Sequence, residues 1–139
     1  MGSEMCIRDS YIPAQILGCL IGVMLANVFF EHDILELSTK NRDGFHIFLS
    51  EIIATFGLIF IIFATQKDGK IIIAASVATY IMAGYWFTSS TSFANPAVSI
   101  ARTFTDSFTG INYLNTPTYI LAEFLGALIA VYFIKKLIK

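Results

Sequence analysis

Four long apolar runs set the limits on what this sequence can fold into. They cover roughly residues 11–30, 46–65, 71–88 and 118–138, and most charged residues lie in short clusters between them. A run of about 20 apolar residues is long enough to cross a bilayer as a helix. Only 14% of the residues are charged, compared with about a quarter in a typical soluble domain. The sequence therefore predicts an all-α membrane protein with four transmembrane helices.

Basic residues at the ends of the runs indicate an orientation. Five lysines fall on one side, in the loop after residue 66 and at the C-terminus: Lys67, Lys70, Lys135, Lys136 and Lys139. The opposite side carries three basic residues: Lys40, Arg42 and Arg102. Cytoplasmic loops are enriched in Lys and Arg, so we expect the C-terminus to be cytoplasmic.

The first ten residues, MGSEMCIRDS, differ in character from the rest. They are polar and lack the apolar region of a signal peptide. The string MCIRDS resembles translated sequencing adapter. We therefore expect residues 1–10 to be a non-native leader, and residues 11–139 to be one domain that is truncated at its N-terminus.

An internal repeat links the first and last runs. Residues 11–22 read YIPAQILGCLIG and residues 119–130 read YILAEFLGALIA, with seven of the twelve positions identical. Equivalent helices three spans apart run in opposite directions, which predicts an inverted-topology repeat with a solute path at its interface. Small residues also recur every fourth position in both runs: Ala14, Gly18, Gly22 and Ala26, and Ala122, Gly126 and Ala130. They favour close helix packing in lipid, although Gly and Ala are common in membrane helices in any case.

The segment between the third and fourth runs reads SSTSFANPAVSIARTFT over residues 89–105. Asn95 is a favoured N-cap and Pro96 suits the first helical position, so a helix is predicted from Pro96 to about Thr105. At about 1.5 Å per residue this helix crosses only half of a bilayer. We predict a re-entrant half-helix whose positive N-terminal end faces the middle of the membrane. The alternative is a surface loop with an ordinary Asn-Pro turn.

These features together resemble the aquaporin, or major intrinsic protein, family. The resemblance covers residues 11–138 and rests on four motifs: Asn95-Pro96-Ala97, AQxxG at Ala14–Gly18, AExxG at Ala122–Gly126 and SEIIAT at Ser50–Thr55. It implies that the four runs are helices three to six of the family. Helices one and two and the first Asn-Pro-Ala loop would then be missing, which leaves an incomplete inverted-repeat fold. The complete protein would be a homotetramer with one pore per subunit.

One departure from the family pattern bears on selectivity. The family usually carries arginine directly after Asn-Pro-Ala, where it narrows the pore and repels cations, and here that position is Val98. The resemblance also assigns lining positions to Ser92 and, within about two residues, to Ala83. Small residues and apolar residues at these positions predict a wider and less polar neck, similar to that of a bacterial subgroup of glycerol and arsenite channels with valine after Asn-Pro-Ala.

The predicted pore-lining residues are therefore Ala83, Ser92, Asn95, Pro96, Ala97, Val98 and Arg102. Arg102 shares a face of the half-helix with Val98, because the two are four residues apart. Two roles are open for it: a positive charge at the pore mouth, or a solvated residue paired with Asp106.

Glu51 is an ionisable residue within the second run. Such residues usually mark function or a buried partner, although Glu51 lies only five residues after the start of the run and could sit at the interface. The family resemblance implies that this glutamate accepts hydrogen bonds from the backbone of the re-entrant loop. Glu123 repeats Gln15, which favours a hydrogen-bonding role that does not require charge.

These observations predict a passive channel, and not an enzyme, for water and small uncharged solutes such as glycerol-like polyols and undissociated metalloid acids. The alternatives are a non-conducting fragment, a helical membrane interaction protein and, less favoured, a membrane-embedded enzyme. The net charge of −1 gives no reason to expect nucleic acid binding. Two cysteines are too few for a zinc site, and no cofactor is expected. The resemblance places the protein in a bacterial inner membrane.

Overall fold

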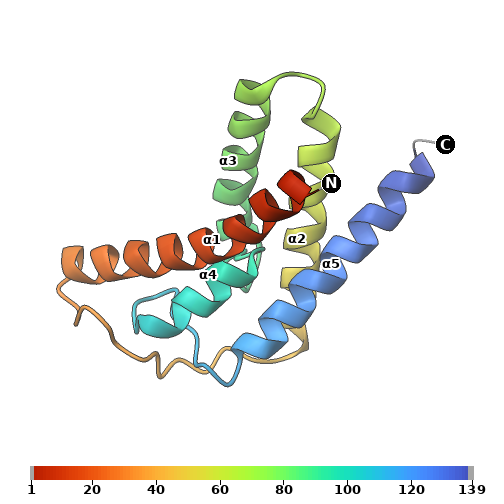
Figure 1. The fold of residues 1–139 in the computed structure, drawn as a ribbon. Coiled ribbons are helices and arrows are strands. Elements are labelled where there is room, and N and C mark those ends of the chain that lie inside the picture. The colour runs from red at the N-terminus through yellow and green to blue at the C-terminus, as the bar shows by residue number, and fades with distance from the viewer. Residues whose placement is uncertain (1, 138–139) are drawn as a thin grey trace. The chain divides into compact units, whose positions relative to one another are not determined.

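The computed structural model describes the backbone of residues 2–137 and the side chains of residues 10–137. The helices are α1 (Gly2–Phe29), α2 (Phe45–Thr65), α3 (Lys70–Phe87), α4 (Pro96–Ala101), the 3₁₀ helix η1 (Arg102–Phe104) and α5 (Thr116–Leu137), as Figure 1 shows. Four of these segments are long and apolar enough to cross a membrane: 10–29, 45–65, 70–87 and 116–137. The described residues contain no strand, and the predicted all-α fold with four spans is confirmed. Lys139 and the predicted end of the last run at residue 138 lie outside the described residues.

The first helix begins earlier than the apolar run predicts. α1 starts at Gly2, whereas the run starts near residue 11, and Ser10–Phe29 is the part that is apolar enough to lie in lipid. Residues such as Glu4, Met5 and Arg8 are good helix formers, so helical hydrogen bonding continues through a segment that hydropathy alone does not mark. That residues 1–10 are a non-native leader stays a prediction.

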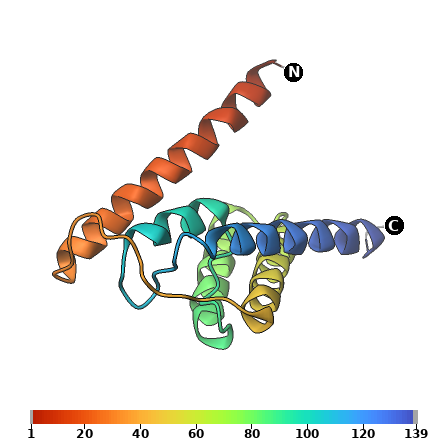
Figure 2. The ribbon, with the colours of Figure 1, turned by 90° about the horizontal axis from the view of Figure 1, so that it is seen from below.

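The chain divides into two compact units, which are described separately. The first unit consists of Met1–Asn41 and Pro96–Thr116, and in it α4 and η1 pack against α1. Figure 2 shows α4 beside the C-terminal part of α1. The second unit consists of Arg42–Asn95 and Pro117–Lys139, and in it α2 and α3 form an antiparallel pair joined by a tight turn. Gly69 adopts a φ of 95° in that turn, a conformation that favours glycine.

The two stripes of small residues behave differently. In the second unit Ala122 and Ala130 are fully buried, and a Cβ added to Gly126 would lie 2.5 Å from the carbonyl oxygen of Ile52. The backbones of α5 and α2 therefore touch at this glycine, as the spacing predicts. In α1, by contrast, a Cβ added to Gly22 would meet no atom within 4 Å, so no such contact forms there in the first unit.

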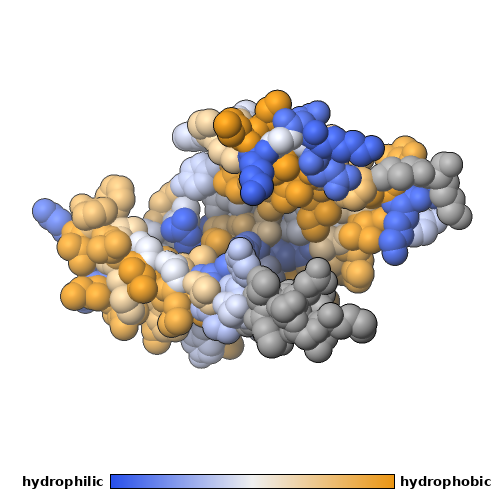
Figure 3. All heavy atoms as spheres, turned by 45° about the horizontal axis from the view of Figure 1, so that its top comes forward, coloured by the Kyte–Doolittle hydropathy of each residue, from blue (hydrophilic) through white to orange (hydrophobic). Residues whose placement is uncertain are grey.

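Large apolar side chains remain exposed along all four long helices. Figure 3 shows apolar side chains over much of the visible surface. Phe29, Ile71 and Trp86 are among the most exposed large apolar residues of the described chain. A soluble monomer rarely leaves apolar patches of this extent in water. Exposed apolar surface of this extent is typical of helices that lie in lipid.

Candidate functional site

The loop before α4 has an unusual backbone conformation. Thr91, Ser92 and Ala94 adopt φ angles of 67°, 52° and 49°, in the left-handed region that residues other than glycine rarely enter. Each such residue costs of order 1–3 kcal/mol and persists only where its surroundings hold it. The contacts of this loop therefore stabilise a backbone conformation that is unfavourable by itself.

Two buried carboxylates hold the end of the loop. Glu51 accepts hydrogen bonds from the amides of Phe93 at Oε1 and Ala94 at Oε2, both at 2.9 Å. Glu123 Oε1 accepts from the next amide, that of Asn95, at 3.2 Å. Both glutamates are almost fully inaccessible, and they project from α2 and α5 into the second unit. Three consecutive backbone donors are thus satisfied by side chains, which stabilises the left-handed turn.

Arg42 holds the other end of the same loop, a role that the sequence reasoning missed. Its Nη2 donates to the carbonyl of Ser89 at 3.1 Å and its Nη1 to the hydroxyl of Thr91 at 3.4 Å. Its guanidinium lies 5.9 Å from the ring centre of Phe93, which in turn packs on Tyr119 at 5.2 Å. The sequence indicates Arg42 only as one of the basic residues on the side opposite the C-terminus. Its partners come from a loop more than 40 positions away, so no local pattern marks them.

Ser92 lies against α3 within the second unit. Its side chain is buried, and its hydroxyl makes no hydrogen bond to the described residues. A Cβ added to Gly84 would lie 2.7 Å from that hydroxyl, so the loop needs glycine at this position to approach the helix. Ala83 is exposed on α3. The helix residue next to Ser92 is therefore Gly84, and the lining role of Ala83 stays a prediction.

The short helix predicted after Asn95 is present. α4 and η1 together run from Pro96 to Phe104 and do not continue as a full span. At roughly 1.5–2 Å per residue this is about half of a bilayer core. Asn27, near the end of α1, donates to the carbonyl of Phe104 at 3.0 Å, while Val98 shares a groove with α1 residues from Cys19 onward. The helix thus starts beside the middle of the Ser10–Phe29 segment and ends beside its end (Figure 1).

A groove of about 180 Å³ lies between α1 and the short helix in the first unit. It is lined by residues of α1 and of the short helix: Cys19, Gly22, Val23, Ala26, Val98, Ala101 and Arg102. Of the predicted lining residues, Val98 and Arg102 therefore share one groove. Asn95 and Pro96 are half-buried and Ala97 is buried at the junction with the loop.

The charged groups near the end of the short helix have separate partners. Arg102 Nη1 donates to the hydroxyl of Thr109. The carboxylate of Asp106 lies 3.7 Å from Lys40 Nζ and accepts from the amide of Thr39 at 2.9 Å. The role of Arg102 at a pore mouth stays a prediction.

The described residues of the site supply hydrogen-bonding groups and a groove. Among residues 10–137 no group of three or more His, Cys, Asp and Glu side chains could hold a metal ion. His32 follows the end of α1, and His46 lies in the first turn of α2. The glutamates of the site are engaged by backbone amides.

Comparison with known proteins gives a specific relative. The chain is 44% identical over 121 residues to aquaglyceroporin AqpS of Rhizobium meliloti (strain 1021), a match that covers 87% of this chain and 52% of the relative. The chain thus spans about half the length of that relative. No family model and no solved structure matches the chain. The predicted resemblance is confirmed by this identity together with the four apolar helices: the chain is a membrane protein of the aquaporin, or major intrinsic protein, family.

Proposed function

We propose that this chain supplies part of a passive channel for water and small uncharged solutes, among them glycerol-like polyols and undissociated metalloid acids. The observation that carries the proposal is the loop held by Glu51 and Glu123, which leads directly into the short helix. Irregular backbone at membrane depth is tolerated only where it is buried in protein or lines a water-filled cavity. Two carboxylates in otherwise apolar helices are costly, and here both accept hydrogen bonds from that backbone.

The loop and the short helix have complementary roles in this proposal. The helix begins beside the middle of the apolar Ser10–Phe29 segment of α1, which supports re-entry to about mid-depth with the N-terminus inward. Its positive end then repels cations, while the loop carbonyls accept hydrogen bonds from neutral solutes. Val98 in place of a charged residue keeps the neck wide and apolar. The name of the relative, an aquaglyceroporin, agrees with this solute class.

The wider arrangement is part of the same proposal. The lysines that follow α2 and those at the end of α5 favour a cytoplasmic C-terminus in a bacterial inner membrane. The pore-lining set is Ser92, Ala83, Asn95, Pro96, Ala97, Val98 and Arg102, with Glu51 as support of the loop. We propose a homotetramer with one pore in each subunit, and a channel in place of an enzyme.

Flux measurements test this function. The chain is joined to the part of AqpS that it does not cover, and the fusion is reconstituted into liposomes. Stopped-flow light scattering should show faster water and glycerol entry than in protein-free liposomes, with no increase in proton or sodium leakage. A fusion that folds but passes neither solute would favour the alternative, a non-conducting helical membrane protein.

A further inference from the structure

The last turn of the short helix is capped from two distant segments. A helix ends with carbonyls that have no partner inside it. Here the carbonyl of Arg102 accepts from the amide of Ile111 at 3.1 Å, and that of Thr103 accepts from the amide of Ser38 at 2.9 Å. Both donors belong to the first unit, one from the connector that follows α1 and one from the loop that follows η1.

The next carbonyl, that of Phe104, is bound by α1 itself. The side-chain amide of the buried Asn27 donates to it at 3.0 Å, and the same amide donates to the carbonyl of Ile34 at 3.3 Å. One side chain therefore joins the end of α1, the connector and the end of the short helix. The connector is held in register with the helix end, although more than 60 residues separate them in the chain.

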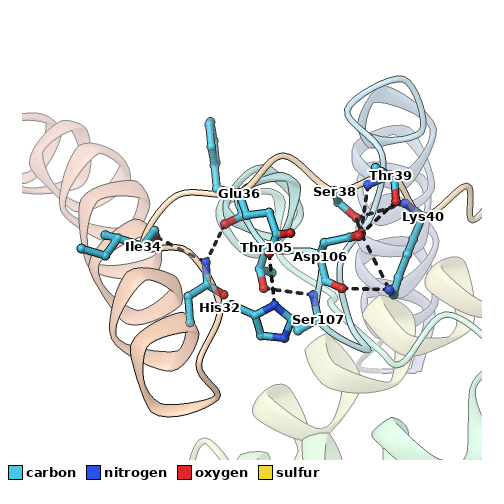
Figure 4. Close-up of polar contacts among 11 residues, drawn as sticks. His32, Ile34, Glu36, Ser38, Thr39, Lys40, Thr105, Asp106 and Ser107 are labelled. Atoms are coloured by element: carbon cyan, nitrogen blue, oxygen red, sulfur yellow. Dashed lines mark hydrogen bonds and ion pairs between the residues drawn. The ribbon is translucent and has the colours of Figure 1, made fainter.

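Asp106 is the centre of this arrangement, as Figure 4 shows. Its Oδ1 accepts from the amide of Thr39 at 2.9 Å and from the hydroxyl of Ser38 at 3.2 Å, and its Oδ2 accepts from the hydroxyl of Thr39 at 3.0 Å. Lys40 Nζ donates to the Asp106 backbone carbonyl at 2.8 Å. Three consecutive connector residues thus bind one aspartate. Ser38 and Thr39 donate to its charged carboxylate, and hydrogen bonds to a charged acceptor are stronger than those to a neutral one.

The loop that carries Asp106 closes tightly on the connector. The amide of Asn112 donates to the carbonyl of Lys40 at 2.8 Å. A Cβ added to Gly110 would collide with the carbonyl of Thr105 and would lie 2.6 Å from the hydroxyl of Ser38. Only glycine permits this approach, so the segment has little freedom to shift while the aspartate contacts are made.

We propose that Asp106 is a positioning residue for the solute path: it fixes the connector on the end of the short helix and so keeps Arg102 and Val98 in place along the α1 groove. This rests on the proposed function for its consequence in permeation, whereas the positioning itself does not. Arg102 is tied to the same loop twice, through its carbonyl to Ile111 and through its side chain to Thr109. Without the aspartate contacts the loop and the connector lose their mutual register, and the arginine moves with them.

Hydrogen exchange tests the positioning on the 139-residue chain in detergent micelles. Asp106→Ala should speed exchange at the amides of Ser38 and Ile111 by about tenfold or more, because hydrogen bonds to a charged acceptor are lost. Asp106→Asn keeps one acceptor oxygen and should show a smaller increase. Asp33→Ala removes the same charge from an exposed position of the same connector and should leave both amides unchanged. Equal protection in native protein and Asp106→Ala would overturn the proposal.

A thiol probe reports on the groove independently. Cys19 lines it, and with Cys6→Ser it becomes the sole thiol of the chain. Its reaction rate with N-ethylmaleimide should rise in Asp106→Ala and not in Asp33→Ala. An unchanged rate would overturn the claim that the aspartate acts on the groove.

The conducting fusion with AqpS supplies the final measurement. Asp106→Ala should change the ratio of glycerol to water flux, while a variant that is merely less stable would lower both fluxes together. A native fusion without flux would reject the proposed function and leave the exchange result standing. Altered exchange with an unaltered flux ratio would reject the link to permeation.

Discussion

Val98 occupies the first turn of α4 and faces the groove beside α1. Val98→Arg adds volume, a fixed charge and up to five donors at this position. We expect glycerol and metalloid flux to fall by tenfold or more, about 1.4 kcal/mol of barrier, and water flux to fall much less. Stopped-flow light scattering on the fusion with AqpS compares the two solutes. Equal losses of both would indicate a blocked pore, and unchanged glycerol flux would remove Val98 from the constriction.

Glu51 illustrates how one buried acid can sustain a strained loop. Glu51→Gln replaces one acceptor oxygen by a donor, which leaves the amide of Phe93 or Ala94 without its partner. An unsatisfied buried donor costs about 1–3 kcal/mol, and we expect the chain to lose stability in that range. Glu31→Gln removes the same charge from an exposed position and is the control. Unfolding titrations in mixed micelles give the difference; a loss of equal size in both variants would show that charge alone matters.

The stabilisation that the Asp106 carboxylate gives the first unit depends on pH. The amide of Thr39 holds the pKa of Asp106 below its usual range, with help from the hydroxyls of Thr39 and Ser38 and the charge of Lys40, against some desolvation. Because the folded pKa is the lower one, the stabilisation is present above the ordinary aspartate pKa of about 4 and is lost as pH falls through the lowered value. Protection of the Thr39 amide, corrected for intrinsic exchange, should therefore be constant from pH 8 to about 5 and should decline below about 4. A decline that begins near pH 6 would point to a different titrating group.

Gly126 of α5 and Gly22 of α1 offer a matched pair of substitutions that tests the contact between helices. In α5, Gly126→Ala would bring a methyl group to 2.5 Å from the carbonyl oxygen of Ile52, a backbone atom that cannot turn aside. We expect a loss of about 1–3 kcal/mol from this overpacking. In α1, Gly22→Ala meets no atom within 4 Å and gains helix propensity, so its stability should be unchanged or higher by up to about 1 kcal/mol. Denaturation in mixed micelles measures the free energy of unfolding of both variants. Equal changes in Gly126→Ala and Gly22→Ala would contradict the contact between α5 and α2.

Much of the element layout could be predicted because lipid makes hydropathy decisive. The four spans and the short helix after Asn95 follow from apolar length and from the Asn-Pro start signal. α1 was the exception at its N-terminus, because residues 2–9 continue the helix without belonging to the apolar run. The small-residue spacing was an ambiguous signal: it marks a backbone contact at Gly126, while Gly22 lines a groove.

The site was predicted only where a motif or an unusual residue marked it. Glu51 stood out as a charge within an apolar run, and Glu123 through its repeat partner Gln15. Arg42 and Asp106 lie among other polar residues, where a functional charge and a solvated one look the same in sequence. Their partners are set by how distant loops meet, and that depends on tertiary structure.

At the level of the whole molecule, the internal repeat relates positions in α1 to positions in α5. Residue 119 repeats residue 11, so equivalent positions are 108 apart, and Ala26 of the α1 groove corresponds to Ile134 of α5. In the second unit Ile134 and Phe63 line an open apolar groove of about 420 Å³ between the C-terminal parts of α2 and α5. By the same offset Gly22 corresponds to Ala130, and both Ala130 and Ile134 are buried, so this face of α5 packs within the second unit.

We expect little selective flux from the 139-residue chain alone, because it spans about half the length of AqpS. A solute path with one wall open to lipid cannot exclude ions and retain neutral solutes. Joined to the part of AqpS that the chain does not match, the same residues should conduct glycerol well above the protein-free background. Liposomes with the chain, with the fusion and with AqpS, at equal protein content, give the comparison by stopped-flow light scattering. Selective glycerol flux from the chain alone, comparable to that of AqpS, would contradict this expectation and would show that one set of four spans and one short helix is sufficient, for instance by association of two copies.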